Sequence, residues 1–176
     1  TVNGKYAVLQ HEGRSWVYWT TAQTAETALL DVGSAIAAED QNPPSATAAL
    51  NSSLRPGELF EFNNSESKLA FVTPAGLNIL DLETRKQQTL AAPTEKHLVG
   101  KLDWVYQEEL YGRGNFKGYW WNPTGDEIAF IMLDESPVPA FIVMDHLPVR
   151  GQAEFTNYPK AGEPLPIVKV GIWKAG

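Results

Sequence analysis

The side chains best suited to metal or redox chemistry are few and widely separated in this sequence. The three histidines, His11, His97 and His146, lack the close spacing that zinc ligands usually have. The chain has no cysteine, which excludes disulfides, thiolate metal sites and a cysteine nucleophile. We therefore expect neither a metal site nor a cofactor.

Hydrolytic chemistry would need a nucleophile, a general base and an oxyanion hole. No Gly-x-Ser-x-Gly elbow occurs, and the serines fall mostly in predicted turns or loops. Asp145 and His146 follow a predicted strand, and we interpret them as a turn pair rather than a catalytic dyad. The sequence thus predicts no catalytic residue in this chain.

Two adjacent glutamates, Glu108 and Glu109, are the remaining group of interest. The chain is acidic, with 21 Asp and Glu against 14 Lys and Arg, and adjacent acids in such a protein usually form a solvated face. The pair alone favours that interpretation, and a binding role depends on the residues around it.

The composition excludes some classes of partner. The formal net charge of −7 argues against nucleic acid, because no basic patch is available to neutralise phosphates. No apolar run approaches about 18 residues, so we expect no membrane span. The chain starts at Thr1 rather than at a methionine, and we expect an excised or processed segment, with any targeting peptide lying outside it.

An internal repeat indicates the fold. Residues 60–72 and 119–131 align without a gap at an offset of 119 − 60 = 59 residues, with aromatic residues on aromatic residues at three positions and Asn63 on Asn122. Each copy predicts an aromatic strand, a polar tight turn and a second apolar strand. After the first copy, residues 77–82 and 87–90 predict two more strands, and four antiparallel strands in roughly 40–50 residues form one propeller blade.

A weaker copy of the blade pattern lies at residues 5–9 and 14–19. We expect the alanine-rich segment 24–38 to be strand and then loop, although its helix propensity is high, and residues 40–56 to connect two blades. Residues 140–144 and 168–173 predict two further strands.

The sequence therefore predicts an all-β fold, a partial β-propeller of about three antiparallel blades in a single domain over residues 1–176. Blade-like units cover roughly 4–50, 58–95 and 118–176, and an insertion at 96–117 carries a short helix with Glu108 and Glu109. A closed propeller has about 4–8 blades, and open blades expose sheet edges. Either the natural protein is longer or the chain forms a homo-oligomer.

Four segments in the second half of the chain resemble one family. In this order and spacing they are similar to motifs in the N-terminal β-propeller region of dipeptidyl peptidase IV-like serine peptidases of the prolyl oligopeptidase family. The segments are Asp103-Trp104-Val105-Tyr106-Gln107-Glu108-Glu109, Tyr119-Trp120-Trp121-Asn122-Pro123, Asp134-Glu135-Ser136-Pro137-Val138-Pro139 and Tyr158-Pro159-Lys160-Ala161-Gly162-Glu163-Pro164. Residues before these motifs resemble the family only in their blade pattern.

The resemblance implies a role for the acidic pair. In this family the propeller packs on a C-terminal α/β-hydrolase domain that supplies the catalytic triad, and two adjacent glutamates on a short helix hold the substrate's free α-amine. By motif position these are Glu108 and Glu109, with Gln107 replacing the preceding Glu of the usual triplet. Each charge-assisted hydrogen bond to an ammonium is worth roughly 1.5–3 kcal/mol. The resemblance also favours an extracytoplasmic or periplasmic location.

The chain departs from the family pattern at a second expected anchor. Family members carry an Arg, after a Trp, that contacts the substrate's backbone carbonyl; aligning the next strand puts Trp19 on the Trp and Thr20 on the Arg. Arg14, six residues upstream of Thr20, is the nearest base. Arg14 and Tyr106 are therefore candidates for lining the substrate cavity, although core packing is the ordinary role of Tyr106.

Two functions fit these observations. The chain is either the substrate-gating region of a longer serine exopeptidase, binding the peptide N-terminus, or a non-catalytic peptide- or protein-binding scaffold of the same architecture. A downstream hydrolase domain with an intact triad would distinguish the first from the second.

Overall fold

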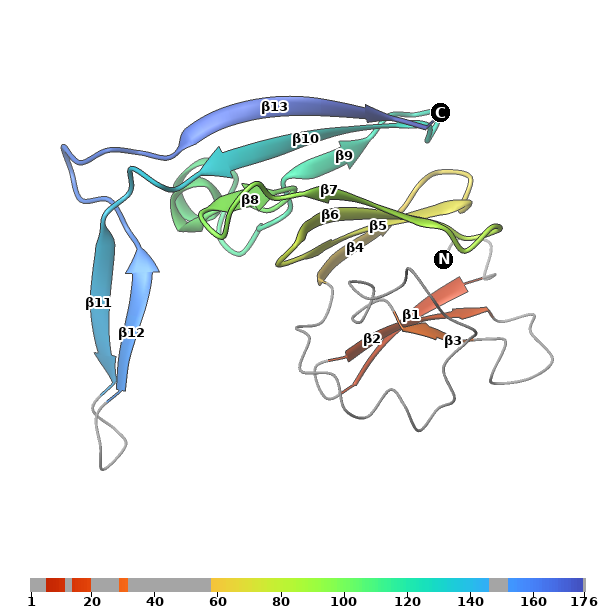
Figure 1. Cartoon of the computed structure of the whole chain (residues 1–176), viewed down its shortest axis with the longest axis horizontal. Coiled ribbons are helices and arrows are strands. Elements are labelled where there is room, and N and C mark those ends of the chain that lie inside the picture. Colours follow the sequence, from red (N-terminus) through yellow and green to blue (C-terminus); the bar gives the residue numbers. More distant parts are fainter. Residues whose placement is uncertain (1–5, 12–13, 20–28, 32–57, 146–151, 176) are drawn as a thin grey trace.

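The computed structural model describes residues 6–11, 14–19, 29–31, 58–145 and 152–175. Over these residues the chain forms antiparallel strands and one short helical turn. Three sheets lie one against the next, and a separate two-stranded hairpin projects from the third (Figure 1). The predicted all-β partial propeller is confirmed.

The first two sheets contain consecutive strands, whereas the chain leaves the third sheet to form the hairpin and then returns to it. The first sheet contains β1 (Tyr6–His11), β2 (Arg14–Trp19) and β3 (Leu29–Asp31), and the second contains β4 (Glu58–Phe62), β5 (Lys68–Thr73), β6 (Gly76–Asp81) and β7 (Gln87–Ala91). In the third sheet β10 (Glu127–Asp134) pairs along its whole length with β13 (Ile167–Lys174), and β8 (His97–Val99) and β9 (Tyr119–Trp121) also pair with β10. The hairpin contains β11 (Ala140–Asp145) and β12 (Gln152–Asn157).

The two turns of the sequence repeat have the same construction. The Asn63 side-chain Oδ1 accepts the backbone N–H groups of Ser67 and Lys68, each at 2.9 Å. The Asn122 Oδ1 likewise accepts from Gly125, Asp126 and Glu127 at 2.8–3.1 Å. In each turn one residue has positive φ, Glu66 at 52° and Gly125 at 77°. Asparagine is therefore repeated because its side chain closes the turn between two strands.

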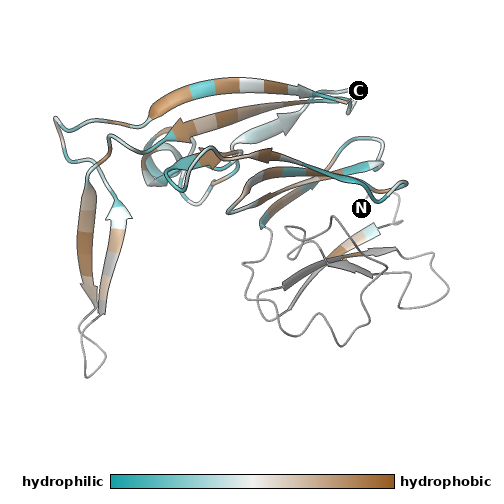
Figure 2. Cartoon of the chain, in the orientation of Figure 1, coloured by the Kyte–Doolittle hydropathy of each residue, from teal (hydrophilic) through white to brown (hydrophobic). Residues whose placement is uncertain are grey.

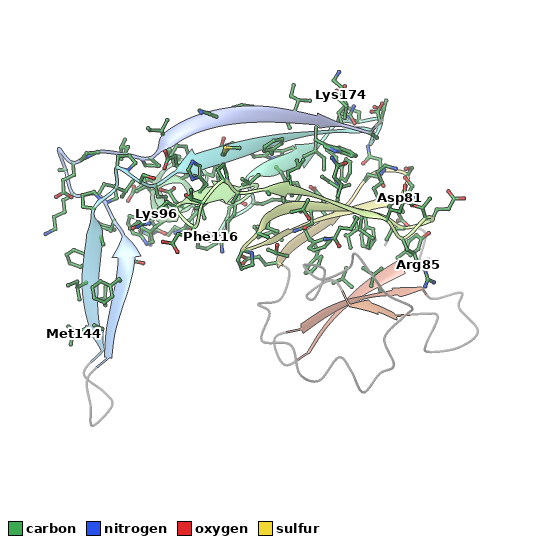
Figure 3. All side chains as sticks on the ribbon, in the orientation of Figure 1. Asp81, Arg85, Lys96, Phe116, Met144 and Lys174 are labelled. Atoms are coloured by element: carbon green, nitrogen blue, oxygen red, sulfur yellow. The ribbon has the colours of Figure 1, made fainter. Side chains whose placement is uncertain are left out.

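Side-chain alternation along the central strands builds two cores. On β5, Leu69 and Phe71 pack toward the first sheet with Val17, whereas Ala70 and Val72 pack toward the third. On β10, Ile128 packs against the second sheet. This period of two is what a strand buried on both faces requires. Figure 3 shows the side chains filling the space between the sheets.

On its opposite face, β10 forms a third cluster. Ile131 and Leu133 are buried there with Leu102, and Tyr106 of the helical turn packs against them. The helical turn therefore packs, through Tyr106, on this face of the third sheet.

Polar contacts join the second and third sheets across the junction between the repeat units. The Tyr119 hydroxyl donates to the carbonyl oxygen of Leu59, and the Trp121 indole Nε1 donates to the Glu61 carbonyl at 3.3 Å. The Asn63 amide donates to the Gly125 carbonyl at 2.9 Å, which links the two turns directly. Lys117 also forms an ion pair with Glu61 at 2.8 Å. The aromatic residues of the repeat thus act as blade-to-blade contacts.

Several secondary-structure elements lie where the sequence predicts them. The structure has strands at the predicted positions 87–90, 140–144 and 168–173 and a helical turn within 103–111. Of the expected strand and loop at 24–38, Leu29–Asp31 is a strand; the other residues there, and the loop at 40–56, lie outside the described residues. Within the segment expected to be an insertion, β8 pairs with β10.

Apolar residues are frequent along the hairpin and β13 (brown in Figure 2), and several of their side chains are exposed. Phe155 and Val170 are 67% and 73% exposed. The expected homo-oligomer stays a prediction. Among the described residues, no helix is long and apolar enough to cross a membrane.

Candidate functional site

The predicted short helix is a π-helical turn, η3 (Tyr106–Leu110), which follows one helical step at residues 104–105. Asp103 begins it: its side-chain Oδ1 accepts the Tyr106 N–H at 2.9 Å, and its carbonyl accepts the Gln107 N–H at 3.1 Å. The turn closes when the Tyr111 N–H donates to the Tyr106 carbonyl at 2.9 Å. A carboxylate at this end satisfies N–H groups that have no partner inside the turn.

Asp103 is buried, with 4% of its surface exposed, and its Oδ2 atom has no hydrogen-bond partner among the described residues. Burial raises the pKa of this carboxyl above its ordinary value, and the bond from Tyr106 only partly offsets that effect. Burial likewise raises the pKa of Glu135, and the negative charge of Asp103 raises it further. A 3.0 Å hydrogen bond from the Asn157 amide acts in the opposite direction. Two carboxyl groups with raised pKa values therefore lie near each other at the base of η3.

The acidic pair lies on η3 itself. Glu108 has a side chain 21% exposed, and its Oε1 lies 2.7 Å from the Nε atom of Arg113. Glu109 is exposed. Consecutive Cα atoms are about 3.8 Å apart, so the two carboxylates project from neighbouring positions of one helical turn.

Gln107 fixes the loop after the pair. Its side chain is buried, its Oε1 accepts the Gly114 N–H at 2.7 Å, and its Nε2 lies 3.5 Å from Glu108 Oε2. An amide can accept and donate at once and carries no charge to desolvate, whereas a carboxylate at this buried position could only accept. The departure Gln107 is therefore suited to its surroundings.

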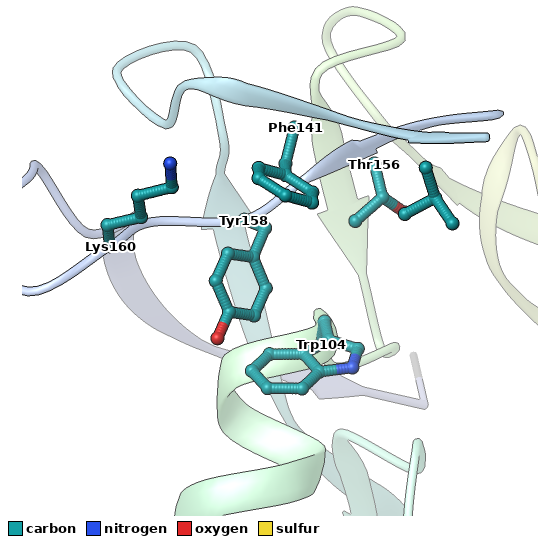
Figure 4. A pocket seen from close by; sticks show the side chains of 6 residues that line it. Trp104, Phe141, Thr156, Tyr158 and Lys160 are labelled. Carbon is teal, nitrogen blue, oxygen red and sulfur yellow. The ribbon is translucent and has the colours of Figure 1, made fainter. Parts of the chain in front are cut away.

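An aromatic pocket lies beside the start of η3, between it and the root of the hairpin (Figure 4). It has a volume of about 470 Å³ and is open to solvent. Trp104 packs on Tyr158 with ring centroids 4.6 Å apart, Tyr158 packs on Phe141 at 5.8 Å, and the Lys160 ammonium lies 5.1 Å from the Phe141 ring. The pocket walls tie η3 to the hairpin.

The four motifs singled out in the sequence thus meet in space. Trp104 contacts Tyr158, and the charge of Asp103 raises the pKa of Glu135. Trp120 stacks on Tyr111, the residue after η3, with ring centroids 6.0 Å apart. The Asp134 carboxylate accepts the Ser136 N–H at 2.9 Å and sets the turn before the hairpin. Residues up to 55 positions apart in sequence are thereby used to hold one helical turn with an acidic tip.

The family model described as "Dipeptidyl peptidase IV (DPP IV) N-terminal region" matches residues 14–176 of this chain. The chain belongs to this family. That match includes β2 and β3 of the first sheet, the whole of the second and third sheets, the hairpin and η3.

Relatives of the dipeptidyl peptidase IV N-terminal region match the chain in part. Dipeptidyl aminopeptidase B of Saccharomyces cerevisiae is 40% identical over 78 residues, 42% of this chain, and the inactive dipeptidyl peptidase 10 of Mus musculus is 38% identical over 74 residues, also 42% of this chain. The chain covers only 9% of the length of each of these relatives.

The solved structure of Porphyromonas gingivalis dipeptidyl peptidase 4 has the same fold as this family member. It aligns with 98% of this chain and 30% of its own length, with a TM-score of 0.60 and 18% identity.

The candidate residues of this dipeptidyl peptidase IV N-terminal region do not all gather at η3. Glu108 and Glu109 lie on it, and Tyr106 faces the Leu102 and Leu133 cluster. Arg14 is the first residue of β2, opposite His11; its side chain and the whole of Thr20 lie outside the described residues.

Sequence reasoning missed Arg113. Its position between two glycines, in Gly112-Arg113-Gly114, could have indicated a tight turn that returns a basic side chain to the acidic pair. No cluster of three or more His, Asp or Glu side chains among the described residues could hold a metal ion.

Proposed function

We propose that this chain is the substrate-binding propeller region of a dipeptidyl peptidase IV-like serine exopeptidase. In this proposal Glu108 and Glu109 hold the free N-terminal ammonium of a peptide substrate. A C-terminal α/β-hydrolase domain in a longer protein supplies the nucleophile, base and oxyanion hole.

The observation that supports the proposal is the way η3 is built. Its acidic tip is anchored by a buried Asp103, by the Trp104–Tyr158 ring contact and by the buried Gln107 amide. A solvated acidic face needs no such anchoring. A binding site does, because side chains held in place lose less conformational entropy when the ligand arrives.

The chemistry follows from the ligand. An α-ammonium carries a positive charge and three N–H donors, and each carboxylate can accept at least one of them. Anchoring the ammonium also fixes which peptide bond reaches a nucleophile in the adjoining domain, so that a dipeptide is released. The propeller contributes position and specificity, and the hydrolase domain contributes bond cleavage.

A second candidate is a non-catalytic scaffold that binds peptides or proteins. It is favoured by the 38% identity over 74 residues to a relative whose name includes "Inactive". The sequence of a hydrolase domain downstream of this chain would distinguish the two: an intact triad supports the exopeptidase, and its absence or a replaced serine supports the scaffold.

The amine-binding role is tested with Glu108→Gln and Glu109→Gln in the longer protein, using a free-amine dipeptide amide and its N-acetylated counterpart. Each change should cost about 1.5–3 kcal/mol of binding to the free-amine peptide, which is roughly a 10- to 150-fold increase in Kd. The N-acetylated peptide carries no ammonium, so it should bind weakly and lose little further.

Glu95→Gln is the matched control, because Glu95 is also an exposed acid but lies in the turn before β8. It removes the same charge and should leave Kd unchanged. Equal affinity of all three variants and the parent for the free-amine peptide would reject the role of the pair.

A further inference from the structure

We propose that Arg113 is a built-in counter-ion for the amine site: it occupies Glu108 when no peptide is bound and must be displaced by the incoming ammonium. This rests on the proposed role of Glu108 and Glu109. It makes Arg113 a residue that sets the affinity of that site.

The contact between Arg113 and Glu108 is close and direct. The guanidinium Nε and the carboxylate Oε1 are 2.7 Å apart, a distance typical of a charge-assisted hydrogen bond. A peptide ammonium would make the same kind of bond to the same carboxylate. One oxygen of Glu108 is thus already engaged by a positive group of this chain.

The backbone holds Arg113 in place for this contact. Gly112 and Gly114 have φ of 97° and 79°, and the Asn115 N–H donates to the Gly112 carbonyl at 3.1 Å. The buried Gln107 side chain accepts the Gly114 N–H at 2.7 Å. The loop is therefore held against η3 by hydrogen bonds from its backbone N–H groups, none of which involves the Arg113 side chain.

The pair is also easy to open. The Arg113 side chain is 87% exposed, whereas the Glu108 side chain is 21% exposed. Exposed ion pairs contribute little to stability, and salt screens them. Arg113 can therefore swing into solvent, and Glu108 stays where η3 holds it.

This asymmetry has a consequence for binding. Glu108 and Glu109 bring two negative charges, and Arg113 offsets one of them. A neutral or N-blocked peptide has no charge with which to displace Arg113, whereas a free-amine peptide replaces one cation with another. The counter-ion therefore weakens binding of every ligand slightly and penalises N-blocked ligands most.

The test measures Kd for alanyl-proline amide by isothermal titration calorimetry with the full-length protein. The variants are Arg113→Ala, Arg113→Lys, Glu108→Gln and the Arg113→Ala/Glu108→Gln double variant. Arg113→Ala removes the competitor without touching the loop backbone and should bind about two- to fivefold more tightly, the range expected for an exposed ion pair. Arg113→Lys keeps the charge and should resemble the parent.

Two further readouts separate competition from a structural effect. In the Glu108→Gln background, Arg113→Ala should produce no tightening, because the contact it removes is already gone. At about 1 M salt, where the screening length is near 3 Å, the parent and Arg113→Ala should converge.

Competition by Arg113 and amine binding by the acidic pair can be rejected separately. If the parent binds the peptide and Glu108→Gln weakens binding, but Arg113→Ala is unchanged or weaker, Arg113 is not a competing counter-ion. If the parent and Arg113→Ala both fail to bind the peptide, the amine site itself is rejected and the inference with it.

Discussion

Replacing Tyr119 by Phe should test the junction between the two repeat units. Tyr119 is completely buried between the second and third sheets, and its hydroxyl donates to the Leu59 carbonyl and lies 3.2 Å from the Ala70 carbonyl. Leu59 has φ of 57° and lies at a register shift between β4 and β5, so its carbonyl is turned out of the regular ladder. The Tyr119 hydroxyl, from β9 in the next blade, is therefore the hydrogen-bond donor for this carbonyl of the irregular strand β4.

The magnitude follows from what the substitution leaves behind. The phenylalanine ring keeps the apolar contacts, so no cavity larger than the lost oxygen forms. The cost is that of a buried carbonyl without its donor, about 1–3 kcal/mol of unfolding free energy. For a chain of this size the melting temperature should fall by about 2–4 °C per kcal/mol.

The assay is urea unfolding followed by tryptophan fluorescence, with Tyr111→Phe as the matched control. Tyr111 loses the same hydroxyl, but it is 45% exposed and stacks on Trp120 at the surface. It should change stability by less than about 0.5 kcal/mol. A Tyr119→Phe effect as small as the control's would show that the hydroxyl does not join the blades.

Two further predictions concern carboxyl groups and pH. At the end of β6 (Figure 3), hydrogen bonds from Thr84 and the Lys68 ion pair lower the pKa of Asp81 to about 2, so its stabilising effect is present above about pH 4 and lost as pH falls toward 2. Asp81→Ala should cost about 1 kcal/mol at pH 7, discounted for its exposure; acid unfolding curves that coincide with the parent's would contradict this. Asp103 behaves oppositely, because burial raises its pKa: stability should fall as pH rises from its unfolded value near 3.8 through the raised folded value. Asp103→Asn, which keeps an acceptor for the Tyr106 N–H, should flatten that pH dependence in unfolding titrations, and an unchanged slope would refute the assignment.

The blade pattern was predictable from the sequence because its physical causes are local. A strand buried on both faces must be apolar at nearly every position, as Leu69–Val72 are, and a tight turn needs a residue such as Asn63 that can close it. When the same combination recurs 59 residues later, the same strand–turn–strand structure is expected in both copies. The repeat therefore specified the strands and their turns.

Other features could not be read locally. That β8 pairs with β10 depends on contacts between residues more than 30 positions apart, and nothing in His97–Val99 alone indicates its partner. The acidic pair was found through its flanking motif, but the pairing of Arg113 with Glu108 depends on two positive-φ glycines and a buried amide acting together. Ion pairs at the surface depend on loop geometry, and the hydrophobic periodicity of the sequence does not predict that geometry.

The most direct test of amine binding by Glu108 and Glu109 is a crystal structure of the full-length protein with a free-amine dipeptide amide. We expect the peptide's ammonium nitrogen to lie within about 3 Å of carboxylate oxygens of both Glu108 and Glu109, with Arg113 moved away from Glu108. A peptide bound with its ammonium elsewhere, and Arg113 still paired with Glu108, would show that the acidic pair does not bind the substrate amine.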